Sequence, residues 1–168
     1  MMGAGKTSIG RLIARRLKRR FIDSDHEIER RCGVKIAVIF EVEGEEGFRR
    51  READVIAELA ANEDIVMATG GGAVLCEATR RLLPERGTVA YLHAAPETLY
   101  ARVRHDRNRP LLNSGDPLRR LQDLYRFRDP LYREVASVVV ESGQSSMSEL
   151  AKQVVAGVEF EQPCSFQT

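Results

Sequence analysis

The chain has 168 residues, of which 43% are apolar and 30% are charged, and its formal net charge at pH 7 is +1. This length and composition favour one globular domain with a real hydrophobic core. The near balance of 26 basic and 25 acidic residues argues against a nucleic-acid or membrane-surface binder, because such proteins carry a one-sided charge excess.

The three cysteines, Cys32, Cys76 and Cys164, are odd in number and follow no metal-ligand spacing. They predict neither a disulfide framework nor a structural metal site, and they indicate a reducing compartment. No apolar run reaches the roughly 18 residues of a membrane span, and no charged-then-apolar leader opens the sequence. We therefore expect a cytoplasmic protein that does not enter a membrane.

The first seven residues, MMGAGKT, match the end of a phosphate-binding loop, G-x-x-x-x-G-K-[ST]. Gly5, Lys6 and Thr7 take the positions of the second glycine, the lysine and the hydroxyl. In such a loop the backbone N–H groups wrap a phosphate chain, the lysine reaches the β- and γ-phosphates, and the hydroxyl holds Mg²⁺. The alternative is an ordinary glycine turn before the amphipathic helix that we predict from Lys6 to Arg19.

A short, partly apolar stretch from Arg20 to Asp25 is predicted as a buried strand with carboxylates at its carboxyl end, the usual ligand edge of an open α/β sheet. Asp23 and Asp25 are two residues apart, so both should project to the same side. One could steer Mg²⁺ near Thr7, and the other could take a proton from a substrate hydroxyl. Alternatively, Ser24 or Asp25 caps the helix that follows.

Residues 34–43 and 45–62 are predicted as helices, with Gly44 as the break between them. Arg49 lies among three consecutive arginines near the start of the second helix, where cations oppose the helix dipole and need an anion. It could grip a bound carboxylate in bidentate fashion. Pairing with a neighbouring Glu45, Glu46 or Glu52 is an equal alternative.

Residues 64–69 are predicted as a second strand, and Gly70, Gly71 and Gly72 follow it directly. Three consecutive glycines cost backbone entropy unless something must come close to the chain. At the carboxyl end of a strand this favours a close approach of ligand to backbone over a plain loop.

Arginines are concentrated in the second half of the chain. Residues 102–115 form a cationic stretch, and we predict a lid over about residues 104–116. Within it, Arg109 has a restricted backbone because Pro110 follows it. Residues 116–136 are predicted as a basic helix that Pro130 should break or kink near Asp129, which would leave Arg128 pointing into a cleft.

The remaining elements complete an alternating pattern. We predict helices over 77–86 and from Pro96, strands over 88–92 and 138–140, and a last helix opened by the capping box Ser146-x-x-Glu149. The alternation predicts a three-layer α/β/α fold with a parallel sheet, in one domain over residues 1–158 with a polar tail over 159–168. A phosphate loop normally follows a central strand, which this sequence lacks.

In order and spacing, these motifs resemble shikimate kinase, a P-loop small-molecule kinase of the nucleoside-monophosphate-kinase type. The matching stretches run from MGAGK (2–6) through DSD (23–25), FRR (48–50), GGGA (70–73) and RPLL (109–112) to RDPLY (128–132). The resemblance implies ATP-dependent phosphorylation of shikimate to shikimate 3-phosphate, with Mg²⁺, in a monomer that binds no nucleic acid and no membrane.

The resemblance also implies roles for single residues. The ATP-binding set would be Gly3, Ala4, Gly5, Lys6, Thr7, Ser8, Arg102, Arg109 and Gln144, with Thr7 and Asp23 serving the metal. Shikimate would be bound by Asp25, Arg49, Gly70, Gly71, Gly72 and Arg128, and Lys6, Asp25 and Arg109 would be catalytic. A related small-molecule kinase such as a gluconate kinase, or a non-catalytic P-loop module that lacks the first strand, is the alternative.

Overall fold

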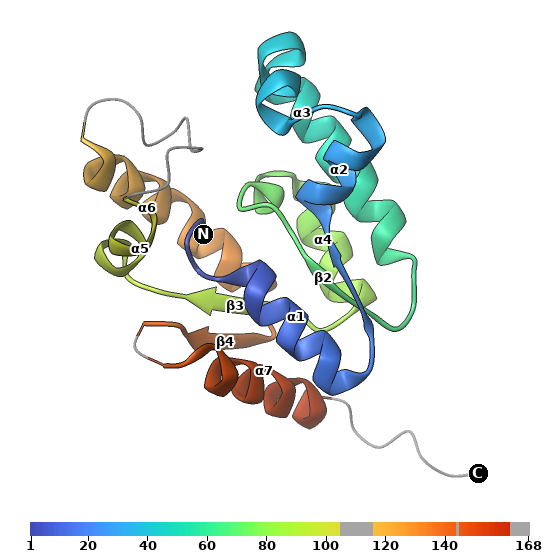
Figure 1. Cartoon of the computed structure of the whole chain (residues 1–168), viewed down its shortest axis with the longest axis vertical. Helices are drawn as coiled ribbons and strands as arrows, with labels where there is room; N and C mark the ends of the chain where they lie inside the picture. The colour runs from blue at the N-terminus through green and yellow to red at the C-terminus, as the bar shows by residue number, and fades with distance from the viewer. Residues whose placement is uncertain (105–115, 144, 162–168) are drawn as a thin grey trace.

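The computed structural model describes residues 1–104, 116–143 and 145–161, and helices alternate with strands along them (Figure 1). The first half contains α1 (Lys6–Leu17), β1 (Arg20–Asp23), α2 (Ser24–Cys32), α3 (Ile36–Ala60) and β2 (Ile65–Ala68). The second half contains the 3-10 helix η1 (Ala73–Leu75), α4 (Glu77–Arg86), β3 (Ala90–His93), α5 (Pro96–Val103), α6 (Pro117–Val135), β4 (Val138–Glu141) and α7 (Met147–Glu161). The alternation confirms the predicted α/β class.

The strands form two parallel pairs. β1 pairs with β2, with Asp23 opposite Ala68, and β3 pairs with β4, with His93 opposite Glu141. Within the described residues these are two separate two-stranded sheets, and no strand joins β2 to β3. The register of the first pair brings the carboxyl end of β1 beside the carboxyl end of β2, where the glycine triplet begins.

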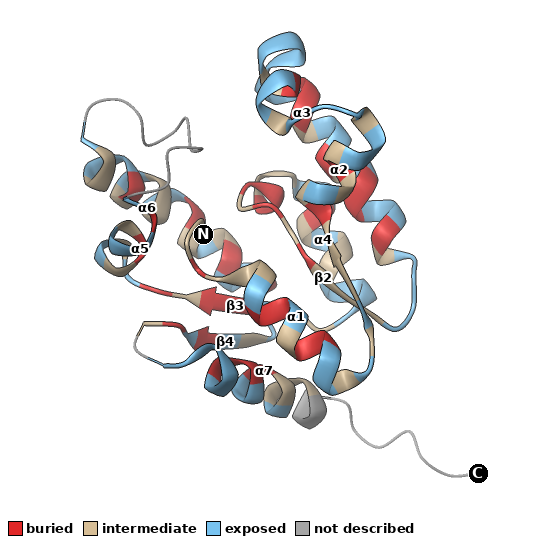
Figure 2. Ribbon diagram, in the orientation of Figure 1, coloured by how far each residue is buried: buried red, intermediate tan, exposed pale blue. Residues whose placement is uncertain are grey.

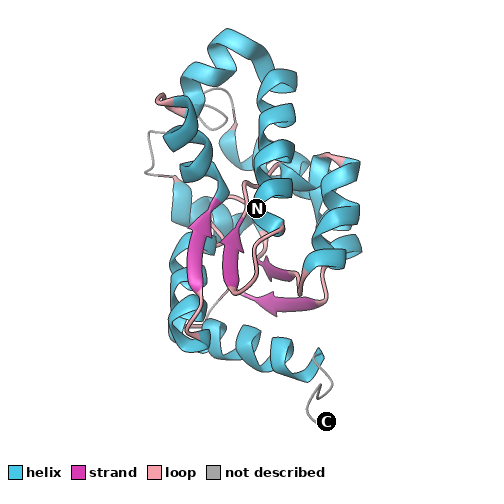
Figure 3. Cartoon of the chain, turned by 90° about the vertical axis from the view of Figure 1, so that its right-hand side faces the viewer, coloured by secondary structure: helices cyan, strands magenta, loops and turns pink. Residues whose placement is uncertain are grey.

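Helices pack on the strands from two sides. α1 contacts β1, β2 and α7, and α7 contacts β4, whereas α4 contacts both α3 and α6. Figure 1 shows α1 passing in front of the strands, and Figure 3 shows the two strand pairs turned steeply relative to each other, with the tall helical arm of α2 and α3 above them. Among the described residues, no helix has both the length and the apolarity that a membrane crossing needs.

The core has two parts. The larger cluster lies on β3 and β4 and draws fully buried side chains from α1, α5 and α6, including Ile9, Leu99 and Leu121. The smaller cluster joins α2 to α3 and is built around Ile28 and Phe48. Figure 2 shows that buried residues face the strands while the outer faces of α1, α3 and α7 are exposed. The smaller cluster therefore holds the helical arm as a unit of its own.

Two breaks predicted from single residues have different outcomes. Gly44 interrupts α3 as predicted, with φ 71° and ψ −177° in an otherwise helical segment. At Pro130 the sequence predicted a break or a kink, and the break is wrong, because α6 continues through this residue to Val135. A proline removes a hydrogen bond to the carbonyl four residues earlier, here that of Arg126. Arg126 and Pro130 are both exposed, so water can satisfy that carbonyl, and buried residues on both sides of the proline hold the helix in place.

Leu121 provides a direct test of the larger core cluster. Its side chain is fully buried, so L121A should lower the free energy of unfolding by about 2–5 kcal/mol through lost transfer energy and a residual cavity. The matched control is V139A, because Val139 on β4 is 43% exposed and its truncation should cost less than about 1 kcal/mol. Urea unfolding of the three proteins measures both, and equal losses would contradict this description of the core.

Candidate functional site

The loop before α1 has the conformation of an anion-binding turn. Gly3 and Gly5 have φ values of 73° and 85°, in the left-handed region that favours glycine. A Cβ on Gly3 would also lie 2.8 Å from Val103 Cγ1 and 3.2 Å from the Leu99 carbonyl oxygen. α1 has no side-chain cap and no acidic residue in its first turn. No acidic side chain in the first turn offsets the positive end of the α1 dipole, which would favour a phosphate there.

The side chains that follow the loop are placed as a phosphate site requires. Lys6 lies in the first turn of α1 and donates from Nζ to the Met1 carbonyl at 2.8 Å. The Thr7 hydroxyl donates to Asp23 Oδ2 at 2.7 Å. Ala4 is buried under the loop and Ser8 is exposed beside it. The structure thus brings Thr7 and Asp23 together, as predicted from the sequence.

The carboxyl end of β1 differs from the sequence-based prediction. The strand ends at Asp23, and Asp25 lies in the first turn of α2. The helix cap is Asp23, and not Ser24 or Asp25, because Asp23 has extended dihedral angles and its Oδ1 accepts from the N–H groups of Asp25 and His26. The argument from strand periodicity was therefore wrong for Asp25. Its side chain is instead directed at Gly70 by the helix.

Each glycine of the triplet is approached by a side chain from another element. A Cβ on Gly70 would collide with Glu52 Oε1 and would lie 2.7 Å from Asp25 Oδ1. A Cβ on Gly72 would overlap the guanidinium of Arg49. Glycine is required at Gly70 and Gly72, because side chains of α2 and α3 lie where their Cβ atoms would be, whereas a Cβ on Gly71 would make only ordinary contacts, the nearest with the Tyr132 hydroxyl at 3.6 Å.

Three buried polar atoms in this region have no hydrogen-bond partner among the described residues. They are Asp25 Oδ1, Glu52 Oε1 and Arg128 Nε. Buried polar atoms are nearly always paired, so unpaired ones need an explanation. They come from α2, α3 and α6, and all lie near the glycine triplet. This convergence favours a binding site for a ligand with both hydroxyl and anionic groups.

Electrostatics at this point combine two carboxylates with two arginines. Arg49 Nη1 donates to Glu52 Oε2 at 2.5 Å, and Arg49 also contacts the exposed Glu45, so the alternative of acidic partners for Arg49 is realised in the structure. Glu52 is only 2% exposed. Burial raises the pKa of Glu52, an effect that Arg49 opposes. Burial also raises the pKa of Asp25, and the nearby Asp23 adds to the rise.

Two residues of α6 bind the same backbone carbonyl. Arg128 is buried and donates from Nη1 to the Gly71 oxygen at 3.1 Å. Tyr132, one turn later on the same face, donates its hydroxyl to that oxygen at 2.5 Å. The carbonyl has two lone pairs, and both are used. α6 is therefore joined to the glycine triplet at its middle residue.

The predicted nucleotide residues beyond the loop are only partly described. Arg102 donates to the carbonyls of Ser142, Gly143 at 3.1 Å and Gly3 at 3.4 Å, and so links the phosphate loop to the segment after β4. Arg109 and Gln144, and most of the predicted lid, lie outside the described residues.

Reasoning from the sequence named Glu52 only as a possible partner of Arg49, a pairing that the structure confirms, and gave Tyr132 no role of its own. Glu52 lies in step with Phe48, Ile56 and Leu59 on the buried face of α3, and an acid at such a position is the signal that was available. Tyr132 is four residues after Arg128, the spacing that places two side chains on one helix face.

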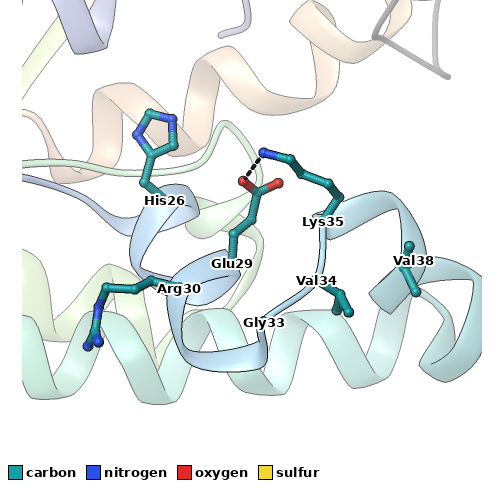
Figure 4. A pocket seen from close by; sticks show the side chains of 7 residues that line it. All are labelled: His26, Glu29, Arg30, Gly33, Val34, Lys35 and Val38. Carbon is teal, nitrogen blue, oxygen red and sulfur yellow. Dashed lines mark hydrogen bonds and ion pairs between the residues drawn. The ribbon is translucent and has the colours of Figure 1, made fainter.

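The hollow at the corner of α2 and α3 is a separate feature (Figure 4). It has a volume of about 550 Å³ and is lined by His26, Glu29, Arg30, Gly33, Val34, Lys35 and Val38. Its charged groups are already paired, since Glu29 accepts from Lys35 at 2.9 Å and Arg30 binds Glu27. It contains none of the unpaired buried atoms, so the glycine triplet remains the better candidate site.

Comparison with known proteins gives a consistent result. Residues 2–159 match the family model described as shikimate kinase. A shikimate kinase of Cupriavidus pinatubonensis is 58% identical over 95% of this chain and 83% of its own length. The structure of shikimate kinase from Acinetobacter baumannii in complex with shikimate superposes with a TM-score of 0.92 at 46% identity, over 96% of this chain and 90% of that one. Shikimate kinase from Aquifex aeolicus gives a TM-score of 0.84 at 32% identity, over 96% and 94% of the two chains.

The buried carboxylate of Glu52 should make the free energy of unfolding depend on pH. Because its folded pKa is raised above the ordinary value of 4.5, its contribution to stability is full below the unfolded pKa and is lost as pH rises through the folded pKa. In E52Q this loss of stability with rising pH should disappear, because glutamine does not ionise. The fall in the free energy of unfolding from about pH 5 to about pH 7 should therefore be smaller in E52Q than in the wild type.

Urea unfolding at the two pH values measures the difference. The control is E46Q, which removes an exposed carboxylate from the same helix and should keep the wild-type pH dependence. An E52Q protein with the wild-type pH dependence would show that Glu52 does not titrate as its burial requires.

Proposed function

Because the chain belongs to the shikimate kinase family, we propose that its glycine loop, Asp25, the partly buried Arg49 and the buried Arg128 form one active site. This site transfers the γ-phosphoryl group of ATP to a hydroxyl of shikimate and yields shikimate 3-phosphate. The observation that carries the proposal is the convergence of the three unpaired buried atoms, from Asp25, Glu52 and Arg128, on the glycine triplet. A hydroxylated acid supplies partners for all three.

The acceptor would be held through its charge. Arg49 and Arg128 would bind the carboxylate of shikimate, since guanidinium groups pair with carboxylates in a fixed, two-pronged geometry. The backbone of Gly70, Gly71 and Gly72 would lie against the ring, because no Cβ separates the ring from the peptide units. The unpaired Oδ1 of Asp25 would accept a hydrogen bond from the attacking hydroxyl.

Asp25 is the candidate base. Burial raises its pKa, and a base is most effective when its pKa lies near the working pH. Phosphoryl transfer depends more on alignment and charge neutralisation than on covalent help. The main task of Asp25 would therefore be to place the hydroxyl in line with the phosphoryl group and to take its proton.

ATP would bind to the loop of Gly3 to Ser8, with Lys6 reaching its phosphates. Arg102 would lie beside the adenine, together with Gln144, and Arg109 would offset charge on the transferring group. Lys6 would leave the Met1 carbonyl to do so, and its charge-assisted hydrogen bond to a neutral oxygen would be exchanged for a stronger contact with an anionic phosphate oxygen.

Mg²⁺ fits the residues present. Thr7 and Asp23 offer a hydroxyl and a carboxylate in direct contact, and Mg²⁺ prefers oxygen ligands, a few from protein and the rest from water and phosphate. The described residues contain no cluster of three or more His, Cys, Asp or Glu that could hold a metal. When bound, the ion neutralises charge on the phosphates. Asp23 would hold it through water.

We further propose that the protein acts as a monomer in the cytoplasm. Cys32 and Cys76 are free thiols, which supports a reducing compartment.

The function is tested by release of ADP. With MgATP, the protein should release ADP in proportion to added shikimate, and gluconate, another hydroxylated acid, should give no signal above background. MgATP alone should raise the melting temperature, because a ligand that binds the native state stabilises it. ADP release with gluconate only, or a folded protein that neither turns over nor responds to MgATP, would contradict the proposal.

Asp25 is tested by D25N, which keeps the shape of the side chain and removes its basicity. We expect kcat to fall by about 10²–10⁴-fold, the usual size of a general-base contribution, with an unchanged affinity for ATP. The control is D54N, at an exposed position on α3, which should have wild-type kinetics. Wild-type turnover in D25N would exclude the proposed role of Asp25.

A further inference from the structure

We propose that Tyr132 is a positioning residue for the acid acceptor, because its hydroxyl fixes the Gly71 carbonyl and so presents the N–H of Gly72 as a donor to the acceptor. The inference rests on the proposed function of the glycine triplet. In this inference, two residues of α6 serve acceptor binding in different ways. Arg128 would contact the acid directly, and Tyr132 would orient the peptide backbone that contacts it.

The geometry starts at the Gly71 carbonyl. Tyr132 and Arg128 both donate to this oxygen, at 2.5 and 3.1 Å. In a trans peptide the N–H of the next residue points opposite to the carbonyl. Fixing the Gly71 carbonyl toward α6 therefore points the N–H of Gly72 away from α6. Among the described residues, no group accepts a hydrogen bond from this N–H, although Gly72 is buried.

The position of this peptide unit matters for anion binding. On its Gly72 side lies the guanidinium of Arg49, which occupies the space of the missing Cβ. On its Gly71 side lies Arg128. A buried N–H with no acceptor between two arginines is a donor suited to a carboxylate. If Arg128 turns toward the bound acid, Tyr132 alone keeps the carbonyl, and hence the N–H, in place.

Tyr132 is itself held rigidly. Its ring stacks on Tyr91 at 4.8 Å between centroids, and the Tyr91 hydroxyl donates to Asp129 Oδ1 at 2.8 Å. Tyr132 is 8% exposed. Burial raises the pKa of Tyr132 to about 12, so the hydroxyl remains a donor at all working pH values. The stack fixes the ring, and the ring fixes the hydroxyl.

The test is Y132F, which removes the hydroxyl and keeps the ring stacked. We expect the KM for shikimate to rise roughly tenfold, the effect of a lost buried hydrogen bond. The value of kcat should change less than about twofold and the KM for ATP should stay unchanged, because the N–H binds the acceptor in ground and transition state alike. A loss of structure alone would instead lower kcat and affect both substrates.

The matched control is Y91F. It removes the other hydroxyl of the stacked pair, which contacts Asp129 and no glycine, and it should leave the KM for shikimate at the wild-type value. An equal rise in Y91F and Y132F would assign the effect to the stack and overturn the inference, as would a wild-type KM in Y132F.

A second measurement separates this inference from the proposed function. The absence of shikimate-dependent ADP release in the wild type contradicts the proposed function. Because Arg128 also holds the Gly71 carbonyl in the ligand-free protein, ligand-free crystal structures of R128M and of the double variant R128M/Y132F then decide the orientation claim. A Gly71 carbonyl that keeps its orientation in R128M and turns away from α6 in the double variant supports the role of Tyr132 in fixing the backbone. A carbonyl with the wild-type orientation in the double variant overturns it.

Discussion

The site depends on the missing Cβ atoms of the glycine triplet. Asp25 and Glu52 crowd Gly70, and the guanidinium of Arg49 occupies the space beside Gly72. Any side chain on these residues would push charged groups away from the backbone and from one another. The strand pair β1 and β2 then sets the position of the whole group, because its register brings Asp23 next to Ala68 and so brings the start of α2 next to the triplet.

This crowding has an electrostatic cost that the rest of the fold offsets. A buried carboxylate such as Glu52 is unfavourable by several kcal/mol unless it is paired, and a single ion pair recovers that cost only in part. Glu52 has one oxygen paired with Arg49 and one unpaired. The apolar cluster of α2 and α3 around Phe48 keeps the arm folded despite this. The electrostatic cost arises where a ligand with a hydroxyl and a carboxylate could supply the missing hydrogen bonds. In the proposed reaction, shikimate is that ligand.

Much of this arrangement could be predicted from the sequence, and the failures have local causes. Motifs with a strict backbone requirement were the most informative: Gly5 has the left-handed conformation of a tight glycine turn, and side chains closely approach Gly70 and Gly72. The predicted approach of a ligand to the glycine triplet stays a prediction. Asp25 does lie near the carboxyl end of β1, but the reason given was wrong, since two-residue strand periodicity does not extend into a helix whose cap is Asp23. Glu52 and Tyr132 were not assigned to the glycine triplet because their placement there depends on which faces of α3 and α6 pack against it. Helical spacing shows which residues share a face, but it does not show which element that face contacts. The prediction at Pro130 considered only the lost backbone hydrogen bond, whereas solvent exposure and the packing of neighbouring residues decide whether the helix continues.

Asp23 joins the two halves of the proposed reaction. Its Oδ2 accepts from Thr7, on the side where phosphate and Mg²⁺ would bind, and its Oδ1 accepts from the backbone N–H of Asp25, on the acceptor side. One carboxylate therefore sets the distance between the metal side and the base. In-line transfer requires the attacking hydroxyl and the phosphoryl group to be aligned within a fraction of an ångström. In the proposed reaction, Asp23 would help to provide this alignment, because the residue that ends β1 also caps α2 and so fixes the start of that helix.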